Sequence, residues 1–380
     1  MSPRFLFGGT EVASLGGAST ALYDLFQRFL KDGHDAHLVN ILESQDAAFF
    51  QYTFEGSLGN PSGVANVSVC WLTDDPMAPQ PALREIVERL NPDVLVGFGY
   101  YASMLFKQAA PERRTVFVTG SCQQAQDYIM SGRAEDAIAL GQWLAGRAAA
   151  PRLLHPGERI AMDRVDLVVT HSPQTRSMIQ WFFPSSMGKI YPDVISFAEW
   201  ICDGALPWRD QARPFDDRDI DVLFIATDWD RPVKNYPLVE AIANQLGSRS
   251  VHIVGDVPHP TPHATHHGFL ESRDTVFDLL GRARAVVSPS LIDAAPGILW
   301  EGSVLGCNVV ASKNCGNWEL CHPDLLVDPF GLESFVTCIR RALTRKFDDN
   351  RNVCLAQRGY TEFVALLTAF AQPFQPSSPS

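Results

Sequence analysis

Two acids eight positions apart, with a Pro-Gly step between them, mark the segment of this chain best suited to bind a ligand. It follows a predicted strand over 285–287 and contains Asp293, Pro296-Gly297-Ile298 and Glu301. The Pro-Gly step begins a predicted helix, and the free N–H groups and dipole of a helix start attract phosphate. The flanking carboxylates can accept hydrogen bonds from sugar hydroxyls. The segment therefore predicts a site for a sugar-phosphate-nucleoside ligand.

A second polar loop carries two cations, Arg231 and Lys234, between the apolar strand predicted over 221–226 and a helix that begins near Pro237. Loops that follow parallel strands meet at the carboxyl edge of the sheet. Cations at that edge can neutralise a diphosphate that leaves with both electrons of a glycosidic bond. The alternative is a pair of solvated cations, which a helix start disfavours unless an anion binds there.

The acids lie between Ser288-Pro289-Ser290 and Val309-Val310-Ala311-Ser312, and this arrangement resembles the nucleotide-sugar loop of retaining GT-B glycosyltransferases of the family-4 type. The resemblance implies that Asp293 contacts the donor sugar and that Glu301 contacts the ribose hydroxyls. It also implies that Lys234 contacts the diphosphate and that the helix start at Pro296-Gly297-Ile298 lines the site.

The chain departs from the family pattern at three places. Asp293 stands where the family usually has Glu, and Ala294-Ala295-Pro296 replaces the usual Gly-Phe-Gly. Asp228 occupies the place of a family arginine, and we expect Arg231 to substitute for it from nearby.

The loop over 8–20, between the first predicted strand and helix, contains Gly16-Gly17, which matches a Gly-Gly pair that the family places near the donor phosphates and the acceptor. Related enzymes often have a histidine in the middle of this half, and none follows the strand over 115–118. His171 follows a later strand, and we expect it to have a structural role.

Asp228-Trp229-Asp230 matches the Asp-x-Asp triplet with which another glycosyltransferase class binds a divalent metal. The match is only three residues long, and Lys234 already supplies positive charge. We therefore predict no metal site and no cofactor apart from the nucleotide sugar as co-substrate.

Strands and helices alternate nearly throughout, which predicts an α/β protein with parallel sheets covered by helices. The resemblance implies the GT-B fold, in which two Rossmann-like domains face each other across a cleft. The expected parts are an acceptor-side domain over 1–200, a linker over 201–219, a nucleotide-sugar-binding domain over 220–372 and a loose tail over 373–380. A helix over about 353–370 is expected to pack back on the first domain.

The 380 residues are 46% hydrophobic and 19% charged, which indicates a folded globular protein. The net charge of −12 argues against nucleic acid as a partner. No apolar run reaches the ~20 residues that span a bilayer. The eight cysteines are scattered without a Cys-x-x-Cys pair, which predicts buried thiols and a cytoplasmic location.

These observations together predict a metal-independent glycosyltransferase that moves a sugar from a nucleotide-diphosphate sugar to an acceptor with retention of configuration. Retention is implied by the resemblance alone. Two alternatives remain, a nucleotide-sugar epimerase of the same fold and a binding protein that has lost catalysis. The sequence does not specify the base, the sugar or the acceptor.

Overall fold

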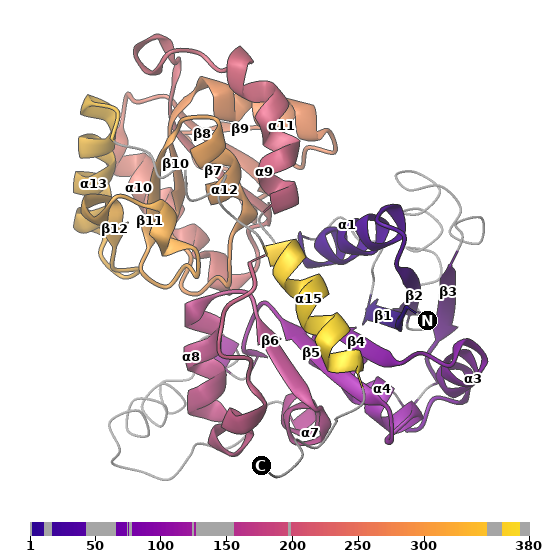
Figure 1. The fold of residues 1–380 in the computed structure, drawn as a ribbon. Coiled ribbons are helices and arrows are strands. Elements are labelled where there is room, and N and C mark those ends of the chain that lie inside the picture. The colour runs from indigo at the N-terminus through magenta and orange to yellow at the C-terminus, as the bar shows by residue number, and fades with distance from the viewer. Residues whose placement is uncertain are drawn as a thin grey trace, which may run out of the picture.

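The computed structural model describes residues 2–10, 17–42, 66–73, 75, 78–123, 125–126, 156–196, 199–347 and 359–372. These residues form two α/β domains, each built on a six-stranded parallel sheet with helices around it (Figure 1). The predicted fold class, with two Rossmann-like parallel sheets, is confirmed. Among the described residues, no helix combines the length and apolar character needed to cross a membrane.

The first sheet has the strand order β3-β2-β1-β4-β5-β6, and all its pairs are parallel. Its strands are apolar because helices cover both faces. The strands are β1 (Arg4–Thr10), β2 (Asp35–Leu42), β3 (Val67–Trp71), β4 (Val94–Phe98), β5 (Arg114–Thr119) and β6 (Leu167–Thr170). The helical segments are α1 (Gly17–Lys31), α3 (Pro81–Leu90), α4 (Tyr100–Ala109), α7 (Pro156–Arg164), α8 (Pro173–Phe182) and η4 (Pro184–Lys189).

The second sheet has the order β12-β11-β10-β7-β8-β9, again with parallel pairs. Its strands are β7 (Ile220–Asp228), β8 (Val251–Asp256), β9 (Thr265–His266), β10 (Ala283–Ser288), β11 (Asn308–Ser312) and β12 (Leu326–Val327). The helical segments are η7 (Pro232–Lys234), α10 (Tyr236–Leu246), α11 (Arg273–Arg282), α12 (Gly297–Val304), η8 (Trp318–Leu320), η9 (Pro323–Leu325) and α13 (Leu332–Thr344).

The segment predicted as a linker is largely helical and packs on the second domain. It contains the end of α9 (Glu199–Ala205), then η5 (Leu206–Gln211) and η6 (Phe215–Asp217). Cys202 and Ala205 share a buried cluster with Leu299 and Trp300. The buried Arg218 donates hydrogen bonds to the carbonyls of Ala283 at 2.6 Å and Leu305 at 2.7 Å. Pro207 lies in the first turn of η5, Pro214 precedes η6, and Asp216 and Asp217 lie within η6.

The last described helix, α15 (Gly359–Ala371), lies against the first domain although it follows the second in sequence (Figure 1). Tyr360, Phe363 and Leu367 are buried in the same cluster as Phe5 and Phe29 of that domain. The Tyr360 hydroxyl also donates a hydrogen bond to the Asp32 carboxylate at 2.6 Å. The chain therefore crosses between the domains a second time and completes the first core.

We predict that Phe363→Ala destabilises the first domain by roughly 3 to 5 kcal/mol, because it removes a fully buried aromatic ring and leaves a cavity. Urea unfolding followed by circular dichroism measures the change. Thr361→Ala, at an exposed position of the same helix, is the control and should change stability by less than ~0.5 kcal/mol. Equal unfolding of the two variants would show that α15 does not support this core.

We expect a histidine pair to make the second domain sensitive to acid. His252 on β8 and His267 lie with their ring nitrogens 2.9 Å apart, and burial lowers the pKa of both. Below pH ~6.5 the unfolded chain therefore binds more protons than the folded chain. We predict that the free energy of unfolding falls as the pH drops from 7.5 to 5, and that it falls less in His252→Gln. A variant with the unchanged pH slope would contradict this assignment.

Candidate functional site

The candidate site lies at the carboxyl edge of the second sheet, where β7, β10 and β11 end at neighbouring positions. Three loops leave this edge, over 229–235, 289–296 and 313–317. In a parallel sheet these loops are brought together by strand pairing, so residues far apart in sequence become neighbours. The first two loops carry most of the site residues predicted from the sequence.

Lys234 and Asp293, which are 59 positions apart, meet in an ion pair with 2.5 Å between Nζ and Oδ2. The Lys234 side chain is 21% exposed and that of Asp293 is 15% exposed. Asn235, in the left-handed conformation at φ 61°, donates from its side chain to the carbonyls of Pro289 and Pro329, both at 3.1 Å. These bonds fix the segment that holds the lysine.

The loop of Asp293 is braced by the third loop of the edge. The Asp293 amide donates to the Asn314 carbonyl at 3.1 Å, and the Gly316 amide donates to the Asp293 carbonyl at 2.8 Å. A Cβ at Gly316 would lie 1.6 Å from the Ala294 carbonyl oxygen, so only glycine permits this approach. The backbone around the carboxylate is therefore fixed before any ligand arrives.

The helix α12 begins at Gly297, directly after this loop, with Pro296 at its N-cap. No side chain caps this helix start. Gly297 and Ile298 are partly exposed, and the Asn317 side chain donates to the Pro296 carbonyl at 2.9 Å. An anion at this point would meet amide hydrogens and the positive end of the helix dipole.

Glu301 lies one turn into α12 and is 3% exposed. Its carboxylate forms an ion pair with Arg273 at the start of α11. The residue expected to contact ribose hydroxyls is thus buried and already paired with a cation. Neither the pairing nor its partner was predicted from the sequence.

Arg231 is exposed at the N-cap of η7, three residues before Lys234. Asp228, the first acid of the Asp-x-Asp triplet, accepts a hydrogen bond from the Asp230 amide at 2.8 Å. Within the described part of the chain, no three or more His, Cys, Asp or Glu side chains are grouped so that they could hold a metal ion. Gly16 lies outside the described residues, and Gly17 is the first residue of α1.

The first domain meets this site through the turns after β5 and β6. The Gln174 side chain donates to the Asn314 carbonyl at 2.5 Å, and a Cβ at Gly316 would lie 2.5 Å from the Ser172 hydroxyl. His171 lies in the same turn, and burial lowers its pKa to about 4, so its ring is neutral at pH 7. From the sequence, a structural role was expected for His171. Because this residue directly follows a strand, its position in the sequence could have indicated that it lies at the carboxyl edge of the first sheet.

Apolar contact also joins the domains beside the ion pair. Val233 and Ile292 each precede one of the two charged residues, and both are buried. They belong to a cluster whose other members come from the first domain: Phe117, Cys122, Ala125, Met162, Val165, Val168, Ile179, Phe182, Phe183 and Ile190. The loops that carry the charges are therefore packed against the opposite domain.

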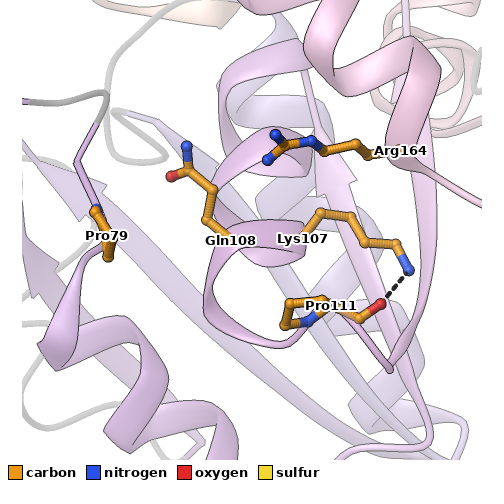
Figure 2. Close-up of a pocket in the computed structure, with 5 residues that line it drawn as sticks. All are labelled: Pro79, Lys107, Gln108, Pro111 and Arg164. Carbon is orange, nitrogen blue, oxygen red and sulfur yellow. Dashed lines mark hydrogen bonds between the residues drawn. The ribbon is translucent and has the colours of Figure 1, made fainter.

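A hollow of about 530 Å³ opens elsewhere, at the far edge of the first sheet, between Pro79, Gln108 and Arg164 (Figure 2). Lys107 also lines it, but its ammonium group is bound to the Asp166 carboxylate at 2.8 Å and to the carbonyls of Pro111 and Arg113. These bonds serve the structure of the domain. We therefore place the functional site at the edge where the domains meet.

Comparison with known proteins finds a family that matches part of the sequence and solved structures with a similar fold. Residues 15–191 match the family described as Glycosyltransferase Family 4. Sucrose-phosphate synthase from Thermosynechococcus elongatus has a TM-score of 0.68 at 14% identity, with 97% of this chain and 99% of that chain covered. No curated protein sequence matches the chain.

Two further structures have a similar fold. HepE from Anabaena in complex with UDP has a TM-score of 0.67 at 13% identity, with 96% and 100% of the chains covered. The lipopolysaccharide outer core galactosyltransferase WaaB has a TM-score of 0.66 at 11% identity, with 97% and 99% covered. The first domain thus matches a glycosyltransferase family, and the chain as a whole shares the two-domain fold of these structures.

Proposed function

We propose that this enzyme transfers a sugar from a nucleotide-diphosphate sugar to an acceptor, with retention of anomeric configuration and without a metal. The observation that carries the proposal is the Lys234–Asp293 pair beside the start of α12. It combines a cation and free amides for a diphosphate with a carboxylate for sugar hydroxyls. The Anabaena HepE structures in complex with UDP and with UDP-glucose support a donor of this class.

The proposed chemistry breaks the bond between the anomeric carbon and the diphosphate oxygen, and both electrons leave with the nucleoside diphosphate. The ammonium of Lys234 and the amides near Gly297 and Ile298 stabilise the negative charge that develops on the leaving group. Arg231, exposed three residues away, contributes positive charge at the same edge. Before donor binds, Asp293 holds the lysine, and the incoming phosphate then shares it.

Retention requires the acceptor oxygen to bond to the anomeric carbon on the face that the diphosphate leaves. In this scheme the departing phosphate oxygen takes the acceptor proton, so no protein base is needed. Asp293 orients the donor sugar through its hydroxyls. The neutral ring of His171 lies in the turn that faces this loop and can donate or accept a hydrogen bond without adding charge.

The charges at the site support the proposal that no metal is needed. Lys234 supplies a cation where a diphosphate would lie. The Asp228 carboxylate, which a divalent ion would need, accepts a hydrogen bond from its own loop at 2.8 Å. The acceptor is expected to bind on the first domain, and contact between the domains excludes water that would otherwise hydrolyse the donor.

A thermal-shift screen against UDP-, GDP- and dTDP-sugars tests the proposal, because a ligand that binds only the folded state raises the melting temperature. The stabilising donor is then assayed for hydrolysis and for interconversion of the free nucleotide sugar. Slow hydrolysis without interconversion is expected. Interconversion would indicate an epimerase, and binding with no turnover of any donor would indicate an inactive binding protein.

We predict that Lys234→Ala lowers the turnover number for donor hydrolysis by about 10²- to 10³-fold, because it removes the cation that stabilises the leaving diphosphate. Lys234→Arg should recover part of the rate, since its charge is kept but its geometry differs. Lys31→Ala, at the exposed end of α1 and outside the loops of the site, is the control and should turn over donor at the wild-type rate. Equal rates in Lys234→Ala and wild type would reject the assigned role.

We also predict that dialysis against EDTA leaves the rate of donor turnover unchanged within about twofold, because protein groups supply the positive charge. The rate is measured before chelation, after it, and after adding back Mg²⁺ or Mn²⁺. A large loss of rate on chelation that is restored by either ion would contradict the metal-free mechanism. It would indicate Asp228 and Asp230 as candidate metal ligands.

A further inference from the structure

Glu301, the carboxylate expected to contact the donor ribose, is almost fully buried. Only 3% of its side chain is exposed, and its Oε1 atom pairs with the Arg273 guanidinium. A buried carboxylate without a partner would be neutralised by a proton, since removing a bare charge from water is costly. A neutral carboxylic acid is a weaker hydrogen-bond acceptor than a carboxylate. Arg273 is the cation that balances the charge of Glu301 in this structure.

Arg273 is held at this place by more than Glu301. Its guanidinium carbon lies 5.1 Å from the centre of the Phe277 ring, one turn along α11, within the range of a cation–π contact. Desolvation raises the pKa of the Asp24 carboxyl on α1 of the first domain, and the charge of Arg273 opposes that rise. Arg273 thus experiences attraction from both domains.

Exposure differs sharply between the two members of the pair. The Arg273 side chain is 61% exposed, whereas Glu301 is buried. The pair therefore engages Oε1 of the carboxylate, and within the described part of the chain the second oxygen, Oε2, has no ion pair or side-chain hydrogen bond. An arginine fork suits this task, because one N–H can hold one carboxylate oxygen in a defined direction.

We propose that Arg273 is a positioning residue for ribose recognition: it pairs with Oε1 of Glu301, balances the charge of that buried carboxylate, and directs Oε2 toward the hydroxyls of the donor ribose. The inference rests on the proposed function, since it needs a nucleoside diphosphate at this edge. It goes beyond that function by assigning a role to a residue of α11 that lies outside the three loops of the site.

The test compares a ribose-containing ligand with an analogue that lacks the ribose hydroxyls. Binding of UDP or GDP, whichever binds wild type more tightly, and of its 2′,3′-dideoxy form is measured by calorimetry. Wild type should prefer the hydroxylated ligand by about tenfold, the value of one hydrogen bond to a charged group. In Arg273→Gln that preference should nearly vanish, while affinity for the dideoxy ligand changes by less than about twofold.

Four further variants test the assignment. Glu301→Gln should lose the same preference, and the double variant should lose no more, because both changes remove one interaction. Arg273→Lys should keep part of it. Arg249→Gln removes an exposed arginine from the same domain and should retain the full preference. The melting temperature of each variant shows whether it is folded. If Arg273→Gln does not fold, Arg273→Lys is compared with wild type in its place.

Other outcomes would overturn the inference. Equal weakening of both ligands in Arg273→Gln would indicate a general effect of charge or folding. Tighter binding of the hydroxylated ligand would mean that Arg273 obstructs Glu301. A wild-type protein that binds ribose and dideoxy ligands equally would exclude ribose recognition by Glu301 while leaving the diphosphate site intact. Failure of wild type to bind any nucleoside diphosphate would instead reject the proposed function itself.

Discussion

The Lys234–Asp293 ion pair is the constraint on which the site depends. A lysine close to the start of α10 faces the positive end of a helix dipole, which is unfavourable for a cation. The carboxylate 2.5 Å away offsets that cost. Because both side chains are only partly exposed, solvent screens the attraction less than it would at the surface. The protein thus holds a preformed cation at the strand ends, balanced by an acid until an anionic ligand shares it.

Contact between the domains also restrains the two loops that carry the ion pair. Val233 and Ile292 bury their side chains in the cluster that contains the core of α8, so the two charged loops are packed against the first domain. The helix α15 returns to that domain and completes its core with Phe363. Rotation of one domain against the other would therefore disturb the backbone on either side of the ion pair. The geometry of the ion pair therefore depends on packing between the domains as well as on charge.

Sequence patterns predicted the parts of the site that depend on local order. Apolar strands followed by polar loops placed Lys234, Asp293 and the start of α12 at one edge, because parallel strands end together. Patterns of this kind do not specify contacts between helices, so the Arg273–Glu301 pair was not predicted. The segment over 201–219 was predicted as a linker because its prolines and acids outweigh its few apolar residues. Its burial depends on Cys202 and Ala205 meeting α12, which only the tertiary structure shows.

Two of the three departures from the family pattern have a physical explanation in this structure. With Lys234 in contact, a glutamate at position 293 would carry its carboxylate one methylene too far and would have to fold back, so the shorter Asp293 suits this lysine. The next residue, Ala294, is confined on two sides. Its carbonyl packs on Gly316, and its Cβ would lie 3.9 Å from a Cβ placed on Gly120 of the first domain. A bulky side chain there would press the domains apart, so small residues at positions 294 and 120 permit the close approach that buries Ile292 beside the acid.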